Sequence, residues 1–540
     1  PTRRSSDLAQ GGAAEAMAKR AAAVKAKADA QDYDAALALL DEIAKDCRDH
    51  APFHVLRGEL TMKLAAQARD AGRKGVALLF QDAIAAWQRA VELDAEPNAP
   101  RQMLAQAQYE AGQVAEASQT LDRLLLHMQS GGGGKPEELA ALHTLRANAA
   151  ARAYAQKKND GADDKELLTA ARASFRFLED KQRLDLPLLQ LWSATEQWAG
   201  TGAEAVNVFA RALQRTPDDG LLFDPLIDTA GVTRQMQLAV DALRARTDAT
   251  GQWYLGKARF LLAHAERTAG KPDLAQKTLD AARADFAESM QKNPAFRDSS
   301  EQWIAMCLGK KGTIALGADD AANAEKWLLE SARMRPDRLV DDLGDGESTK
   351  RSILFLVDKF LKRRDLAKVE SIARAAAEAA TGDVDLQNNS GLFARDHGNA
   401  LERAGKAKEA NEMYEQSYKA YRRAHDLDPS NVRLRNDCAL IAIWHLERDW
   451  DLAKKLLDGA IADGERTLRE NPPADRDLKE QLDEAVGDCW ENLALWQLKH
   501  GKDPAAAKAA ALKSQQHHPG QDRNNARRHL QAAERLLQGK

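Results

Sequence analysis

Cysteine is scarce in this sequence, with four cysteines among 540 residues. Cys47, Cys307, Cys438 and Cys489 form no CxxC pair, and no histidine stands at zinc-binding spacing from them, which argues against a zinc site or a dithiol redox site. The sequence predicts that these side chains are small packing residues on helices rather than disulfides. Cysteine usage therefore leaves both a cytoplasmic and a periplasmic location open.

Long hydrophobic runs and an excess of charge of one sign are also missing. The longest apolar stretches, such as residues 75–80 and 439–444, are far shorter than the roughly 18 residues that a membrane helix needs, so we expect no membrane span. The net charge of −4 gives no general attraction to nucleic acid or to an anionic membrane. We therefore expect no nucleic-acid partner.

Catalytic signatures are absent as well, because the sequence holds no HExxH, no GxSxG and no protein-kinase motif. Gly251–Lys257 nearly matches a phosphate-binding loop, but Ala258 stands where a hydroxyl should bind magnesium. Asp341–Gly346 is similar to a calcium loop, but Leu343 occupies a ligand position and Ser352 the place of the closing glutamate. We expect no enzyme activity, no cofactor and no metal site.

What the sequence does have is one helical spacing that repeats. A small residue is followed by an aromatic residue four positions later, a small residue three after that, and a proline five further on, as in Ser417, Tyr421, Ala424 and Pro429. The same phase recurs, with leucine once in place of the aromatic residue, at Ala205–Pro217, Ala282–Pro294 and Ala324–Pro336. Small anchor residues 34 to 36 positions apart, together with abundant alanine and only 5% aromatic residues, predict stacked helical hairpins.

This chain resembles a tetratricopeptide-repeat (TPR) protein. The residues that carry the resemblance are His397–Leu401, Gly405–Ala410 and Ser417–Pro429. The resemblance implies an all-α, helical-hairpin solenoid in which Gly398 lets two helices of one hairpin approach and the first helices line a concave groove. Insertions in several units predict an irregular solenoid, either broken or in two blocks.

The first eight residues match the translation of a common sequencing-library adapter, which predicts that an upstream signal peptide, anchor or domain is missing. The four glycines at 131–134 predict a linker because they cannot hold a helix. The expected organisation is an artefactual or disordered tail at 1–12, TPR-like repeats at 13–130, a Gly-rich linker at 131–136, central repeats at 137–336, a loop at 337–350, C-terminal repeats at 351–520 and a capping helix at 521–540.

One polar stripe is the candidate binding site. Arg395, Asn399 and Arg403 are four residues apart and so share one face of a first helix. The next first helix adds Arg435 and His445. Such a groove suits a peptide carboxylate or an acidic segment, although solvated charge explains the same pattern. The carboxylate clamp of the family needs a further asparagine, and alanine occupies the corresponding places at 439 and 442, so that clamp is incomplete.

The sequence therefore predicts a non-enzymatic scaffold that binds a protein or peptide partner in the groove of a TPR solenoid. Two alternatives stay open. The chain is the regulatory or substrate-recruiting repeat region of a larger enzyme, such as a kinase or hydrolase, or it is a periplasmic assembly factor. The identity of the partner and the oligomeric state do not follow from the sequence.

Overall fold

The computed structural model describes residues 19–130, 134–517 and 523–539, which are almost entirely helical and contain no strand. The chain forms two compact units, Pro1–Ala245 and Arg246–Lys540, and each is considered separately. The prediction of an all-α, TPR-like helical-hairpin solenoid is confirmed. The adapter-like residues and the rest of the expected tail at 1–12 lie outside the described residues.

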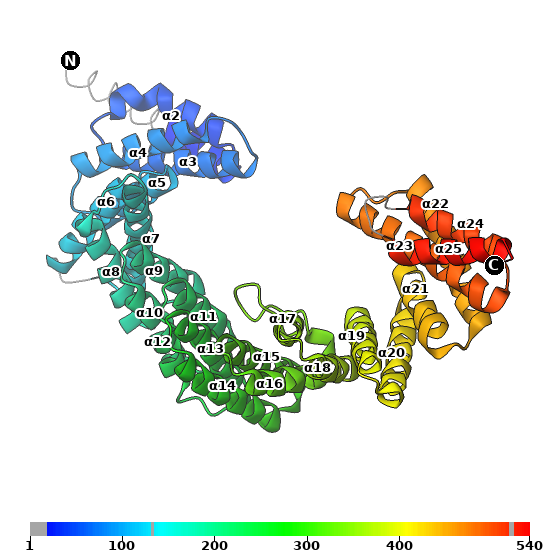
Figure 1. Cartoon of the computed structure of the whole chain (residues 1–540). Coiled ribbons are helices and arrows are strands. Elements are labelled where there is room, and N and C mark those ends of the chain that lie inside the picture. Colours follow the sequence, from blue (N-terminus) through cyan, green and yellow to red (C-terminus); the bar gives the residue numbers. More distant parts are fainter. Residues whose placement is uncertain (1–18, 131–133, 518–522, 540) are drawn as a thin grey trace, which may run out of the picture. The chain divides into compact units, whose positions relative to one another are not determined.

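Unit 1 begins with a helix at residues 19–29 and continues as a series of hairpins (Figure 1). Its further elements are α2 (Tyr33–Cys47), α3 (Ala51–Asp70), α4 (Val76–Leu93), α5 (Asn98–Glu110), α6 (Val114–Ser130), α7 (Pro136–Asn159), α8 (Lys165–Asp180), α9 (Leu186–Trp198), α10 (Gly202–Arg215), the 3₁₀ turn η1 (Gly220–Leu222), α11 (Phe223–Val232) and α12 (Met236–Leu243). Helices α6 and α7, on either side of the glycine run, pack against each other.

Unit 2 holds six hairpins and a final helix among its described residues. Its elements are α13 (Ala249–Thr268), α14 (Pro272–Lys292), η2 (Pro294–Phe296), α15 (Arg297–Gly317), α16 (Ala321–Met334), η3 (Pro336–Arg338), α17 (Thr349–Lys362), α18 (Leu366–Ala379), α19 (Val384–Arg403), α20 (Ala407–Leu427), α21 (Val432–Ile441), η4 (Ala442–Leu446), α22 (Trp450–Glu470), α23 (Arg476–Trp496), η5 (Gln497–Gly501), α24 (Pro504–Gln516) and α25 (Asn524–Leu537). The turns η4 and η5 are π-helical.

Local signals in the sequence start and stop many of these helices. An aspartate side chain accepts a hydrogen bond from the first turn and so satisfies a backbone N–H that has no helical partner. Residues that do this are Asp32, Asp164, Asp185, Asp248, Asp320, Asp365, Asp383, Asp475 and Asp503. At the other end of α19, Gly405 has φ +78°, which ends the helix in the left-handed conformation that glycine adopts easily.

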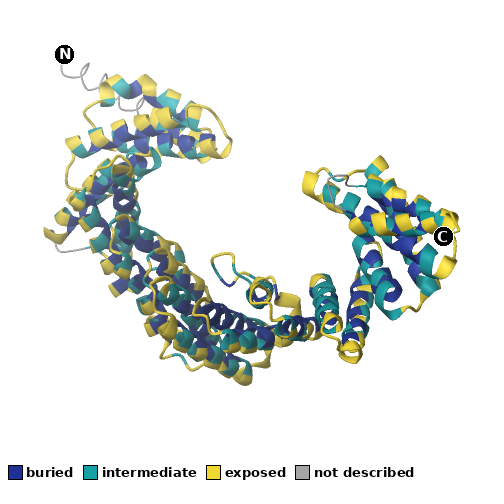
Figure 2. Ribbon diagram, in the orientation of Figure 1, coloured by how far each residue is buried: buried dark blue, intermediate teal, exposed yellow. Residues whose placement is uncertain are grey.

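The hairpins of unit 2 stack in two layers. The first helix of each hairpin, from α13 to α23 in odd-numbered order, belongs to what we call the first-helix layer, and the even-numbered helices form the other layer. Within the first-helix layer, α13 contacts α15, α15 contacts α17, and α21 contacts α23. Buried side chains lie between the two layers, and exposed ones cover the outer faces of both (Figure 2). Helix α25 packs on α23 and α24.

Glycines allow an aromatic ring of the second helix to reach the backbone of the first. A Cβ atom on Gly398 would lie 2.7 Å from the ring of Tyr414, and one on Gly391 would lie 2.7 Å from the ring of Tyr421. Tyr421 also packs with Cys438 of the next hairpin. The close approach that the resemblance implies at Gly398 is therefore present, and the aromatic residue that fills it is Tyr414.

Candidate functional site

Helices α19 and α21 are first helices of successive hairpins and carry the predicted stripe. Arg395 lies in the middle of α19 with 24% of its side chain exposed. Its Nε and Nη2 atoms donate to Asp396 Oδ1 at 3.0 and 2.9 Å. Burial opposes the charged form of this guanidinium. Its interactions with Tyr421, and then with Asp396 and Asp437, outweigh burial and raise the pKa of Arg395.

Tyr414 of α20 joins two other residues of the stripe. Its hydroxyl lies 3.0 Å from Asn399 Oδ1 and 2.8 Å from Glu402 Oε2, so its single proton is shared between two acceptors. Its ring stacks on the imidazole of His445 with centroids 3.9 Å apart and planes at 20°. Burial, and then the bond to Glu402, raise the pKa of Tyr414, which keeps the hydroxyl protonated. Tyr414 thus brings Asn399 and His445 together.

His445 lies in the π turn η4 and does not carry charge at neutral pH. Burial lowers the pKa of His445 to about 4, and the positive charges of Arg395 and Lys499 act in the same direction. The imidazole therefore offers a hydrogen-bonding nitrogen rather than a cation to a ligand. Together, Arg395, Asn399 and His445 form a small polar cluster that suits hydrogen bonds to a peptide backbone as well as to a carboxylate.

The other two residues of the stripe lie elsewhere. Arg403 is exposed at the C-terminal end of α19 and makes no ion pair within the part of the chain that the structure describes. Arg435 donates to the carbonyl of Pro429 at 2.7 Å and to Asp463 Oδ2 of α22 at 2.7 Å. Its guanidinium is therefore engaged within its own hairpin. The structure brings three of the five predicted residues together and leaves these two apart.

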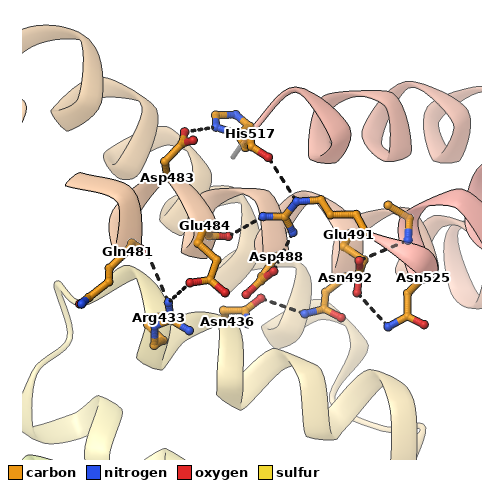
Figure 3. A network of polar contacts seen from close by, with 12 residues as sticks. Arg433, Asn436, Gln481, Asp483, Glu484, Asp488, Glu491, Asn492, His517 and Asn525 are labelled. Carbon is orange, nitrogen blue, oxygen red and sulfur yellow. Dashed lines mark hydrogen bonds and ion pairs between the residues drawn. The ribbon is translucent and has the colours of Figure 1, made fainter. Parts of the chain in front are cut away.

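A polar network connects α21, α23 and α25 (Figure 3). Asn492 of α23 donates to Asn436 Oδ1 of α21 at 2.8 Å, and Arg433 of α21 lies 3.4 Å from Glu484 Oε2 of α23. Burial raises the pKa of Asp437, between these contacts, to about 6, although Arg433 and Arg395 oppose the shift. The network fixes the spacing of the first helices at this end of unit 2.

Arg523 extends the network to α25. Only 4% of its side chain is exposed, and it donates to Asp488 Oδ1 at 2.7 Å and to the Glu484 carbonyl at 3.1 Å. His517 Nδ1 lies 2.8 Å from Asp483 Oδ1, a carboxylate of α23 (Figure 3).

A second polar surface, which sequence reasoning missed, lies on α13 and α15. Its basic residues bind the segment 339–348 between η3 and α17, which we call the strap. Arg267 donates to both carboxylate oxygens of Glu347, with Nη2 2.6 Å from Oε1. Lys310, whose side chain is 0% exposed, donates from Nζ to the Leu343 carbonyl at 2.7 Å. The strap therefore lies on the first-helix layer (Figure 1).

Further contacts hold the strap along its length. His264 Nε2 lies 3.7 Å from Asp345 Oδ1, and Gln302 donates to Asp341 Oδ2 at 3.0 Å. Arg351 of α17 donates to the Gly346 carbonyl at 3.1 Å. All three contacting side chains come from first helices. Burial, and then the charge of Arg267, lower the pKa of Lys310 from its ordinary value.

The strap has its own local structure. The Leu343 N–H donates to the Glu347 carbonyl at 2.8 Å, which closes a turn over Gly344, Asp345 and Gly346, all with positive φ. The Leu343 side chain is 1% exposed. It lies above Gly309 of α15, where a Cβ atom would come within 3.0 Å of Leu343 Cδ1. The segment at 337–350 is therefore anchored at two buried leucines, Leu339 and Leu343, and by its acidic residues.

Neither a metal site nor a membrane span is found among the described residues. Among the described residues, no group of three or more histidine, cysteine, aspartate or glutamate side chains is placed to hold a metal ion. Over the same residues, no helix has both the length and the apolar character to cross a membrane.

Comparison with known proteins finds likeness at the level of fold. No protein-family model matches the sequence, and no curated protein matches it. A TPR protein from Parabacteroides merdae is 14% identical over 52% of this chain and 95% of that chain, with a TM-score of 0.28. Yeast Tom70 is 12% identical over 92% and 99%, with a TM-score of 0.22. The human IFIT1 dimer with m7Gppp-AAAA is 12% identical over 82% and 81%, with a TM-score of 0.26. These scores are too low to support an argument about function.

Proposed function

We propose that this protein is a non-enzymatic scaffold that binds a protein partner by holding an extended segment of it on the first-helix layer of unit 2. The observation that supports this most strongly is the strap. A segment without helix lies on α13, α15 and α17, held through one backbone carbonyl by Lys310, through one carboxylate by Arg267, and by the buried side chain of Leu343. Surfaces that recognise peptides combine these three kinds of contact.

The cluster at Arg395, Asn399 and His445 is the part of the layer that we assign to the partner. It lies on α19 and η4, and among the described residues no hydrogen bond or ion pair joins it to the strap. Asn399 Oδ1 accepts from Tyr414, while its amide nitrogen donates no hydrogen bond among the described residues. Arg403, one turn further along α19, is exposed. These groups are available to a backbone carbonyl or a carboxylate of a partner.

Replacing Arg395 and Asn399 together by alanine should weaken binding of the partner at least tenfold, because both groups that face the ligand are removed while the helix former alanine is tolerated. The measurement is a pull-down from extract of the source organism, with helicity followed by circular dichroism. The matched control is Asn411→Ala with Arg423→Ala, which removes an exposed asparagine and an exposed arginine from α20 of the same hairpin. Unchanged binding by the first pair would refute this assignment.

A further inference from the structure

The strap is acidic, and the surface beneath it is basic. Four of its residues carry carboxylates: Asp341, Asp342, Asp345 and Glu347. The first helices under it present His264, Arg267 and Lys310, which are 33 to 81 positions away from their strap partners in the sequence. The contact is therefore formed between distant parts of the chain and is electrostatically complementary.

Leu339, the first residue of the strap, is 3% exposed and belongs to the core around α15–α18, whereas the rest of the strap is attached like a bound ligand. Between Val340 and Glu347, Leu343 is the one buried residue, and Val340 is 70% exposed. The other contacts are a buried hydrogen bond from Lys310 to the Leu343 carbonyl, the two-pronged Arg267–Glu347 ion pair, and weaker contacts at partly exposed positions. The partly exposed contacts contribute modestly one by one. Segments held by few apolar contacts open locally at low free energy.

The surface also extends beyond the strap. A pocket of about 240 Å³ lies beside Glu347 and is lined by Arg267, Thr313, Leu316 and Phe355, among others. Phe355 projects from α17 with 59% of its surface exposed. An apolar side chain of a bound segment has room there, next to the arginine that holds Glu347.

We propose that the surface formed by His264, Arg267, Lys310 and Phe355 binds an acidic, leucine-containing segment of a protein partner, and that the strap is a built-in competitor for it. This inference rests on the proposed function, because it names the chemistry of a segment that binds the same layer. The acidic character of the bound segment follows from charge complementarity, and its leucine follows from the space over Gly309 in which the Leu343 side chain packs. Lys310 would donate a hydrogen bond to a backbone carbonyl of the segment, and Arg267 would pair with a carboxylate four residues after the leucine.

Tethering gives the strap an advantage over any free segment. A short tether keeps it at an effective concentration on the order of millimolar, so a free peptide of equal intrinsic affinity competes poorly. Weakening the strap should remove this advantage and expose the surface. The affinity for an added peptide should therefore rise when strap contacts are removed, and fall when Arg267 is removed.

The test uses a fluorescent peptide with the sequence of residues 337–349, titrated onto the full chain by fluorescence anisotropy. We expect the variant Leu343→Ser with Glu347→Gln to bind the peptide at least tenfold more tightly than the unmodified chain. Adding Arg267→Ala to that variant should remove the gain. Adding Arg333→Ala instead, which removes an exposed arginine from α16 in the other layer, should leave the gain in peptide affinity unchanged. Equal affinities of the unmodified chain and the weakened-strap variant would overturn the proposal.

A second measurement needs no variant and so does not depend on how the changed chains fold. Hydrogen exchange on the unmodified chain should show faster exchange at the Leu343 and Glu347 amides when the peptide is in large excess, because the peptide displaces the strap. Unchanged exchange at saturating peptide would overturn the competitor role. A single-stranded oligonucleotide that displaces the strap equally well would overturn the assignment to an acidic peptide. Partner capture that depends on Arg395 and Asn399 is unaffected by these outcomes, so the two proposals fail separately.

Discussion

Replacing Arg523 by alanine should lower the free energy for opening α25 and its neighbours by about 3 kcal/mol, because removing one partner of a buried ion pair leaves the other charge uncompensated. Arg523 is almost fully buried and bonds both Asp488 and the Glu484 carbonyl. Burial already raises the pKa of Asp488, and Arg523 is the main group that opposes this shift. Without it, the carboxylate must take up a proton or reach water by loosening α25.

Native-state hydrogen exchange is the suitable measurement, because opening free energies in a solenoid are local to neighbouring repeats. The amides of α25 and the end of α23 should lose protection in Arg523→Ala, while those of α13 and α14 should not. Arg528→Ala is the matched control, since Arg528 is exposed on α25 and its loss should change opening by less than about 0.5 kcal/mol. Equal protection of α25 in both variants would show that the network does not hold this helix.

Acidification should destabilise the cluster around His445. The pKa of this histidine is about 4 in the folded chain and near 6.5 in the unfolded chain. The stability that neutral His445 contributes to the folded chain is fully present above about pH 6.5. This stability is lost as the pH falls through the folded-state pKa, because the unfolded chain binds the proton first. The difference corresponds to at most about 3 kcal/mol. His445→Gln should therefore lose less stability than the unmodified chain between pH 6.5 and 4 in urea unfolding.

Asp437 changes the pH dependence of stability in the opposite direction to His445 as the pH falls from 6.5 to 4. Its pKa is raised to about 6, so the folded chain binds a proton before the unfolded chain does, and acidification relieves the cost of burying its charge. Asp437→Asn should raise the free energy of unfolding near neutral pH. It should also make this free energy fall more steeply with decreasing pH than in the unmodified chain. A profile that is the same for both variants and the unmodified chain would show that neither group titrates differently on folding.

Two second helices of unit 2 are close to what the sequence predicts, because their limits are set locally. The first helix expected over 391–403 begins earlier, at Val384. The spacing predicts a helix over 407–427, and α20 is Ala407–Leu427, between Gly405 and Pro429. A helix over 451–469 is observed as α22, Trp450–Glu470. The π turns η4 and η5 have no such local signal. Each widens the end of a first helix and is followed by a residue in the left-handed conformation, Glu447 and Lys502.

The site is predicted where its residues follow the helical spacing, which gives Arg395 and Asn399 on one helix and His445 on the next first helix. Arg395 and Asn399 are one turn apart on α19, which periodicity can predict. The pairing of Arg435 with Asp463, 28 positions away, and of Arg267 with Glu347, 80 positions away, depends on how the hairpins stack. No pattern within one helix encodes such contacts. The acidic sequence at 341–347 was visible, but the basic surface that binds it becomes apparent only in the folded chain.

Site-specific photocrosslinking tests most directly whether a partner lies on the first-helix layer. p-Benzoylphenylalanine would replace Phe355 on α17 in one chain and Asn399 on α19 in another, with Asn411 and Arg423 on α20 as positions in the other layer. All four residues are at least partly exposed. The account predicts that positions 355 and 399 crosslink to the same partner protein, through defined peptide segments, and that positions 411 and 423 do not. Crosslinks from 411 and 423 in the absence of crosslinks from 355 and 399 would contradict it.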